Sequence, residues 1–99
     1  MFTFVRTAST PPGKIGESLG FAREVAEYIT KNHGVTIHVG VPVLGNPGRI
    51  MWETRYDSLA DFEAFTGKLR ADPGYQKLIE KSAGLFIPGS MNDEMWSSI

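Results

Sequence analysis

The sequence has 99 residues, of which 41% are hydrophobic and 21% charged, as is typical of a folded globular protein, so we expect one domain over residues 1–99. Ten basic and eleven acidic residues leave a net charge of −1, which argues against nucleic acid and against an anionic membrane surface as partners. Without cysteine the chain cannot form disulfides or thiolate metal sites, and without a signal-like or membrane-length apolar run we expect a cytoplasmic protein.

The first segments predict a strand followed by a helix. Residues 2–8 (FTFVRTA) are rich in aromatic and β-branched types, and the Pro-Pro-Gly stretch at 11–13 cannot continue a strand. From about Lys14 to His33 apolar residues recur at helical spacing, and Gly34 supplies a stop. We therefore expect one strand and one amphipathic helix.

Two alternating segments follow and predict a hairpin. Residues 35–44 and 50–57 each alternate between unlike faces, and the Gly-Asn-Pro-Gly sequence between them supplies a loop. A four-residue loop sets Val39 opposite Thr54, and Pro42 places the first strand at a sheet edge because proline lacks a backbone donor. The face predicted to meet the helices carries Ile37, Val39, Val41, Ile50, Trp52 and Tyr56.

A helical region with a break and a weaker strand complete the chain. Ser58 is a suitable N-cap ahead of an apolar stripe. Asp72 is a second cap, with Pro73 in the first turn of a helical piece that runs to about Leu85. Residues from about 90 to 99 predict the last strand.

The order β-α-β-β-α-β predicts an α+β, ferredoxin-like fold. Crossover rules favour a four-stranded antiparallel sheet with both helices on one face. The other face is left uncovered and carries a mixture of polar and apolar side chains. We therefore expect a homodimer, because a second copy of the sheet is the simplest cover for that face.

The hairpin segment GNPGRIMWETRY, followed at once by SLADFEAFTGKLRADPGYQKL, resembles the dimeric α+β barrel superfamily and, within it, NIPSNAP-like proteins. The resemblance implies a single dimeric α+β barrel domain. The superfamily includes cofactor-free antibiotic-biosynthesis monooxygenases, haem-degrading enzymes and many members of unknown role. Membership would therefore leave the function open, because a fold does not determine the chemistry of its site.

Two aromatic residues are candidates for binding a ligand. Trp52 and Tyr56 share one strand face, and similar barrels often use an aromatic side chain to hold a flat ligand between sheet and helices. The alternative is that both rings simply fill the core with their polar ends satisfied. Both interpretations stay open at this point.

A polar group is predicted on the opposite face of the sheet. His38, Glu53 and Arg55 form either a proton-handling cluster or a polar network at the dimer interface. His33 lies at a helix end, where a cation is favoured, and we expect no catalytic role for it. With two histidines five residues apart and no cysteine, we expect no metal site.

The leading hypothesis is a protein that binds a small aromatic or hydrophobic ligand. If the protein is an enzyme, we expect it to oxidise that ligand as a cofactor-independent monooxygenase. A non-catalytic interaction or assembly module is the alternative. Haem binding or degradation is a third hypothesis, but Asn46 falls in a predicted loop and Asn32 at a helix end, away from a pocket. We therefore expect no cofactor.

Overall fold

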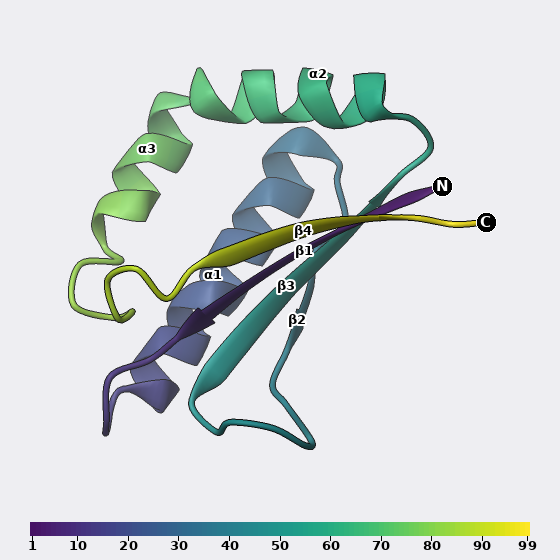
Figure 1. The fold of residues 1–99 in the computed structure, drawn as a ribbon. Helices are drawn as coiled ribbons and strands as arrows, with labels where there is room; N and C mark the ends of the chain where they lie inside the picture. The colour runs from purple at the N-terminus through teal and green to yellow at the C-terminus, as the bar shows by residue number, and fades with distance from the viewer.

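The computed structural model describes residues 1–99 as a four-stranded antiparallel sheet with three helices on one side (Figure 1). The elements in chain order are β1 (Phe2–Ser9), α1 (Ile15–His33), β2 (His38–Gly40), β3 (Arg49–Tyr56), α2 (Leu59–Arg70), α3 (Pro73–Glu80) and β4 (Asn92–Ser97). The strands lie in the order β2-β3-β1-β4, and every neighbouring pair is antiparallel. This arrangement confirms the predicted α+β, ferredoxin-like fold. None of the helices is long and apolar enough to cross a membrane.

Helix α1 packs one continuous stripe against the sheet. The buried residues recur at spacings of one, three and four, as on the covered side of an amphipathic helix: Ser18, Phe21, Ala22, Val25, Ala26 and Ile29. The Ser18 hydroxyl, the one polar group of the stripe, donates to the carbonyl of Leu85 at 2.6 Å. Gly34 ends the helix at a φ of 69°, a left-handed conformation that glycine adopts without strain.

The second helical region is divided into α2 and α3, as the predicted break at Asp72 requires. The Ser58 hydroxyl accepts from the Asp61 backbone N–H at 3.1 Å and caps α2. The Asp72 carboxylate accepts from the backbone N–H of Gly74 at 2.9 Å and of Tyr75 at 3.3 Å, and so caps α3. Helix α2 has no buried residue, and α3 has one. The α2–α3 layer (residues 59–80) is therefore packed more loosely than α1.

Strand β2 is shorter than predicted, and its register against β3 differs by two residues. It has only three residues, and Val39 lies opposite Trp52 rather than opposite Thr54. The backbone leaves the sheet at Val41, because Pro42 has no N–H to donate and restricts the residue before it. Val41 is 53% exposed, so the prediction that it faces the helices is wrong. The expected edge position of this strand is confirmed.

The two faces of the sheet have different surroundings. A shift of two residues keeps side chains on the same face, so the predicted division between faces survives the change of register. Phe4 of β1 and Trp52 of β3 face the helices, on what we call the inner face. Val5 and Glu53 are paired partners on the outer face, which no element covers. Only the inner face is therefore enclosed between the sheet and the helices.

Candidate functional site

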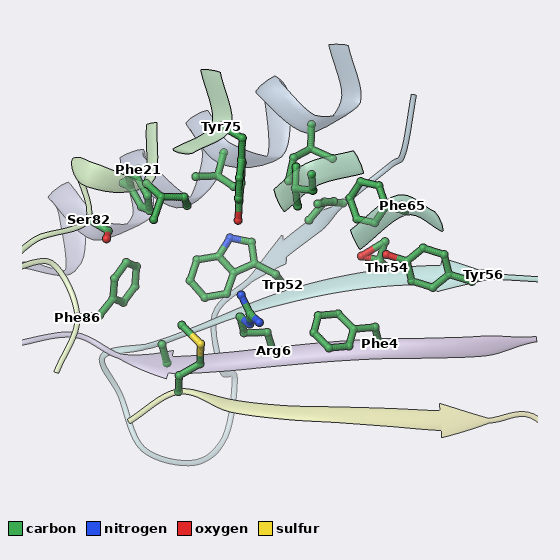
Figure 2. Close-up of a pocket in the computed structure, with 17 residues that line it drawn as sticks. Phe4, Arg6, Phe21, Trp52, Thr54, Tyr56, Phe65, Tyr75, Ser82 and Phe86 are labelled. Atoms are coloured by element: carbon green, nitrogen blue, oxygen red, sulfur yellow. The ribbon is translucent and has the colours of Figure 1, made fainter. Parts of the chain in front are cut away.

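A cavity of about 210 Å³ lies between the inner face and the helices (Figure 2). Strands β1 and β3, all three helices and the segment after α3 each contribute side chains to it. Fourteen of its seventeen lining residues are hydrophobic, so the cavity favours an apolar occupant. An apolar cavity of about 150 Å³ already admits benzene, which gives this one room for one or two fused rings.

Aromatic rings form two groups around this cavity. In the first group, Phe86 packs against Trp52 with 5.6 Å between ring centroids and against Phe21 with 6.0 Å. In the second group, Tyr56 packs against Phe65 with a centroid distance of 6.0 Å. These separations lie within the favourable range for aromatic pairs. Figure 2 shows the Phe86 group and the Tyr56 group at opposite ends of the cavity, with Trp52 between Phe86 and Tyr56.

The indole nitrogen of Trp52 is the one buried side-chain polar atom that makes no hydrogen bond. Strand β3 presents this side chain to the cavity because Trp52 alternates with outer-face residues on either side of it. Figure 2 shows the nitrogen on the edge of the ring that points toward the helices. A buried donor without a partner is costly in a folded protein, so this N–H marks a polar position in an otherwise apolar cavity.

Arg6 is the one charged residue among those that line the cavity, and its charge is already paired. Its Nε and Nη2 atoms donate to the two carboxylate oxygens of Asp93 at 2.7 and 2.8 Å. Strand β1 lies between β3 and β4, so Arg6 has Trp52 as its partner on one side and Asp93 on the other. The hydrogen bonds that Arg6 donates to Asp93 raise the pKa of Arg6, against the opposing effect of burial. The guanidinium therefore stays charged and fixed beside the cavity.

Four hydroxyl-bearing residues also line the cavity, namely Thr54, Ser82, Tyr56 and Tyr75, and the two tyrosines have shifted pKa values. Burial raises the pKa of Tyr56. Burial also raises the pKa of Tyr75, although the positive charge of Arg6 opposes that shift. Both phenols are therefore neutral at physiological pH and can donate or accept hydrogen bonds. Figure 2 shows Tyr75 extending from α3 toward the strands.

A cluster of three side chains fixes the junction between α2 and α3, next to Tyr75. The Asp72 carboxylate accepts from the Tyr28 hydroxyl at 2.9 Å, and its Oδ2 lies 2.8 Å from Nε2 of His33. The His33 hydrogen bond is the main cause of a lowered pKa for Asp72, while burial opposes it. Gly74 leaves room for the Tyr28 hydroxyl, which a Cβ atom would meet. The end of α1 is thereby tied to the α2–α3 layer.

The structure places the predicted ligand-binding residues together. Trp52 and Tyr56 both line the cavity, and their role in ligand binding stays a prediction. Sequence reasoning missed Arg6 and its partner Asp93. A signal for Arg6 was present, because it is the one charged residue in the inward series Phe2, Phe4, Arg6, Ala8 of the first strand. Nothing local in the sequence indicated that Asp93 would lie beside it.

The predicted polar group lies outside the cavity, on the outer face. His38 is the paired partner of Glu53, not of Arg55 as the predicted register required. The Glu53 carboxylate accepts instead from Nε of Arg55 at 3.2 Å, two residues along the same strand. Whether these three residues form a dimer interface or handle protons stays a prediction.

Metal and haem chemistry receive little support from the residues present. No group of three or more potential metal-ligating side chains is clustered anywhere in the chain. Neither His33 nor His38 lines the cavity, so a haem placed there would have no histidine as an axial ligand. The lining does not fit haem, and we derive no chemistry through it.

Solved structures with this fold include proteins of two kinds. A NIPSNAP domain protein from Burkholderia xenovorans matches with a TM-score of 0.85 at 17% identity, over 100% of this chain and 95% of that one. A NIPSNAP family protein from Agrobacterium tumefaciens matches with a TM-score of 0.78 at 24% identity, over 99% and 92% of the two chains. An antibiotic biosynthesis monooxygenase matches with a TM-score of 0.72 at 14% identity, over 100% and 99%. No protein-family model and no curated protein matches the sequence.

The comparisons confirm the resemblance to NIPSNAP-like proteins and the ferredoxin-like fold of the chain. At identities below 25% the likeness is one of fold, and a fold of this kind carries many functions. The function of this chain therefore has to be inferred from the cavity and its side chains.

Proposed function

We propose that this chain is a ligand-binding domain whose cavity holds a small, flat, mainly apolar molecule. The observation that carries the proposal is the 210 Å³ cavity with fourteen hydrophobic residues among the seventeen that line it. The rings of Trp52 and Tyr56 supply large apolar surfaces to a bound ring, and the cavity volume limits that ligand to one or two fused rings.

Thermal unfolding in the presence of one- and two-ring aromatic compounds tests this proposal. A ligand that binds only the folded state at 100 times its Kd adds about 2.7 kcal/mol to the free energy of unfolding, which raises the melting temperature. The substitution Ser82→Leu places a larger side chain in the cavity lining and should abolish the shift. Ser98→Leu, at an exposed position outside the cavity, is the matched control and should keep it. No shift across a broad panel would contradict the proposal.

Oxidation of the bound molecule is a more specific hypothesis, motivated by the antibiotic biosynthesis monooxygenase that shares the fold. In a reaction without a cofactor, a ring methylene loses two hydrogens, which leave with one atom of O2 as water, and the other oxygen atom becomes a ring carbonyl. The test is oxygen uptake with a product of the corresponding mass, in protein and in protein-free samples. Equal rates of oxygen uptake in the two samples would mean that the protein binds the ligand but does not oxidise it.

We further propose that the outer faces of two chains pair in a homodimer. This face exposes Trp96, which is 61% accessible and is paired with Thr3, together with Val5 and Met51 on neighbouring strands. Apolar side chains among charged ones suit a self-complementary interface. Light scattering should give the mass of two chains, and a monomer would contradict this assignment. If a different protein co-purifies with this chain in a fixed ratio, that result would favour the alternative, a non-catalytic interaction module.

A further inference from the structure

We infer that the ligand of this cavity carries a neutral hydrogen-bond acceptor, such as a ketone oxygen, that accepts from Nε1 of Trp52. The inference rests on the proposed function and names the chemical class of the molecule bound at that site. It predicts an aromatic ketone in preference to a hydrocarbon or a carboxylate of the same size.

The indole nitrogen of Trp52 has an unmet need for a hydrogen-bond acceptor. Nε1 of Trp52 is buried, has no hydrogen-bond partner, and belongs to a side chain that lines the cavity. An indole N–H donates and cannot accept, so an acceptor is needed to satisfy it. The protein supplies none, although the Tyr75 side chain lines the same cavity.

Ligands with and without an acceptor differ in whether they satisfy the Trp52 donor. An apolar molecule that fills the cavity leaves the Nε1 donor unpaired. A ligand oxygen at that position supplies the missing acceptor, whereas an apolar ligand leaves the cost of the unpaired donor in place. A single hydrogen bond to a buried donor corresponds to about a tenfold difference in Kd.

The charges beside the cavity favour a neutral acceptor over a carboxylate. Arg6 is the one cation among the lining residues, and both oxygens of Asp93 already accept its hydrogen bonds. A carboxylate ligand would add a second anion beside this pair, in a cavity with no further cation to compensate it. A neutral oxygen takes the Trp52 hydrogen bond without that electrostatic cost.

The remainder of the ligand is defined by the aromatic group next to Trp52. Phe86 and Phe21 pack at this end of the cavity, with 6.0 Å between their ring centroids. A fused ring system therefore has apolar surface to pack against while its oxygen lies at the Trp52 edge. This geometry describes a ligand with one polar edge and an otherwise apolar outline.

Calorimetric titration with three compounds of similar shape tests the inference: 2-acetylnaphthalene, 2-ethylnaphthalene and 2-naphthoate. We expect the ketone to bind about tenfold more tightly than the hydrocarbon and also more tightly than the carboxylate. Equal binding of ketone and hydrocarbon would overturn the inference and leave the proposed function intact. Tightest binding of the carboxylate would overturn the neutral acceptor. If none of the three binds, the proposed function fails, and the inference fails with it.

Three variants assign the preference to one atom. Trp52→Phe keeps an aromatic ring and removes the N–H, so the ratio of the ketone and hydrocarbon Kd values should fall to about one. Trp96→Phe makes the same change on the outer face, outside the cavity, and should leave the ratio unchanged. Tyr75→Phe removes a second hydrogen-bond donor from the cavity lining and tests whether that hydroxyl, rather than Trp52, sets the ratio. A ratio that survives Trp52→Phe but disappears in Tyr75→Phe would overturn the assignment, and circular dichroism confirms that each variant is folded.

Discussion

Helix α1 and the α2–α3 layer cover the same face of one sheet, yet they bury very different amounts of their surfaces. Six side chains of α1 are buried, whereas α2 has none and α3 has only Leu78. The cavity lies where the two coverings and the sheet meet. The difference in burial indicates that α1 stabilises the fold, whereas the looser packing of the α2–α3 layer leaves room for a ligand.

The largest expected effect is in the tightly packed covering. Ile29 of α1 is 2% exposed and belongs to the core cluster, so Ile29→Ala should lower the free energy of unfolding by about 2–5 kcal/mol. Ile79→Ala, the same change at a partly buried position of α3, should have a smaller effect. Urea unfolding of both variants gives the comparison, and equal losses would show that the two coverings are packed alike.

The next effect concerns the cluster that joins the two coverings. Because the pKa of Asp72 is lowered in the folded state, its contribution to stability is complete above the unfolded value of 3.8 and is lost as the pH falls through the lower folded value. The free energy of unfolding should therefore decrease as the pH is lowered through this range. Asp72→Asn keeps a capping oxygen but removes the titration, so its acid-induced loss should be smaller than that of the native protein. Identical acid profiles would contradict this role.

A single hydrogen bond should stabilise the start of the loosely packed layer. The Ser58 hydroxyl is the N-cap of α2, and Ser58→Ala should lower the free energy of unfolding by about 1 kcal/mol. Ser58→Asn, which restores a capping oxygen, should recover most of that stability. Chemical denaturation measures both variants, and an unchanged alanine variant would mean that α2 does not depend on its cap.

The smallest effect is expected where the two coverings touch at the surface. Nζ of Lys81 lies 3.0 Å from Oε1 of Glu24, and both side chains are at least half exposed. Exposed pairs of this kind contribute little, so Lys81→Ala should change the free energy of unfolding by less than about 1 kcal/mol. Added salt should reduce the difference further. A larger, salt-resistant loss would mean that this contact holds the α2–α3 layer in place.

Local sequence signals were sufficient for most of the fold. The caps at Ser58 and Asp72 and the stop at Gly34 act through hydrogen bonds and backbone angles within a few residues, so the sequence alone locates them. The register of β2 depended instead on where the strand ends. Pro42 predicts an edge strand, but it also restricts the backbone of the residue before it, and β2 therefore ends at Gly40.

The candidate site was predictable only in part. Alternation placed Trp52 and Tyr56 on the inner face, because strand periodicity is a local property. The pairing of Arg6 with Asp93 joins residues 87 positions apart, and the orphaned indole nitrogen follows from the packing of three layers. The cluster of Tyr28, His33 and Asp72 was missed for the same reason, since each residue alone is an ordinary helix-end or capping residue.

Nitrogen–proton NMR of the tryptophan side chains tests the central claim most directly, because the chain has two indole N–H groups in opposite surroundings. Trp52 lines the cavity, whereas Trp96 is exposed on the outer face. On addition of 2-acetylnaphthalene, the account predicts that the Trp52 indole signal moves downfield and that the Trp96 signal stays in place. A shift confined to Trp96, or no shift of either signal at saturating ligand, would contradict it.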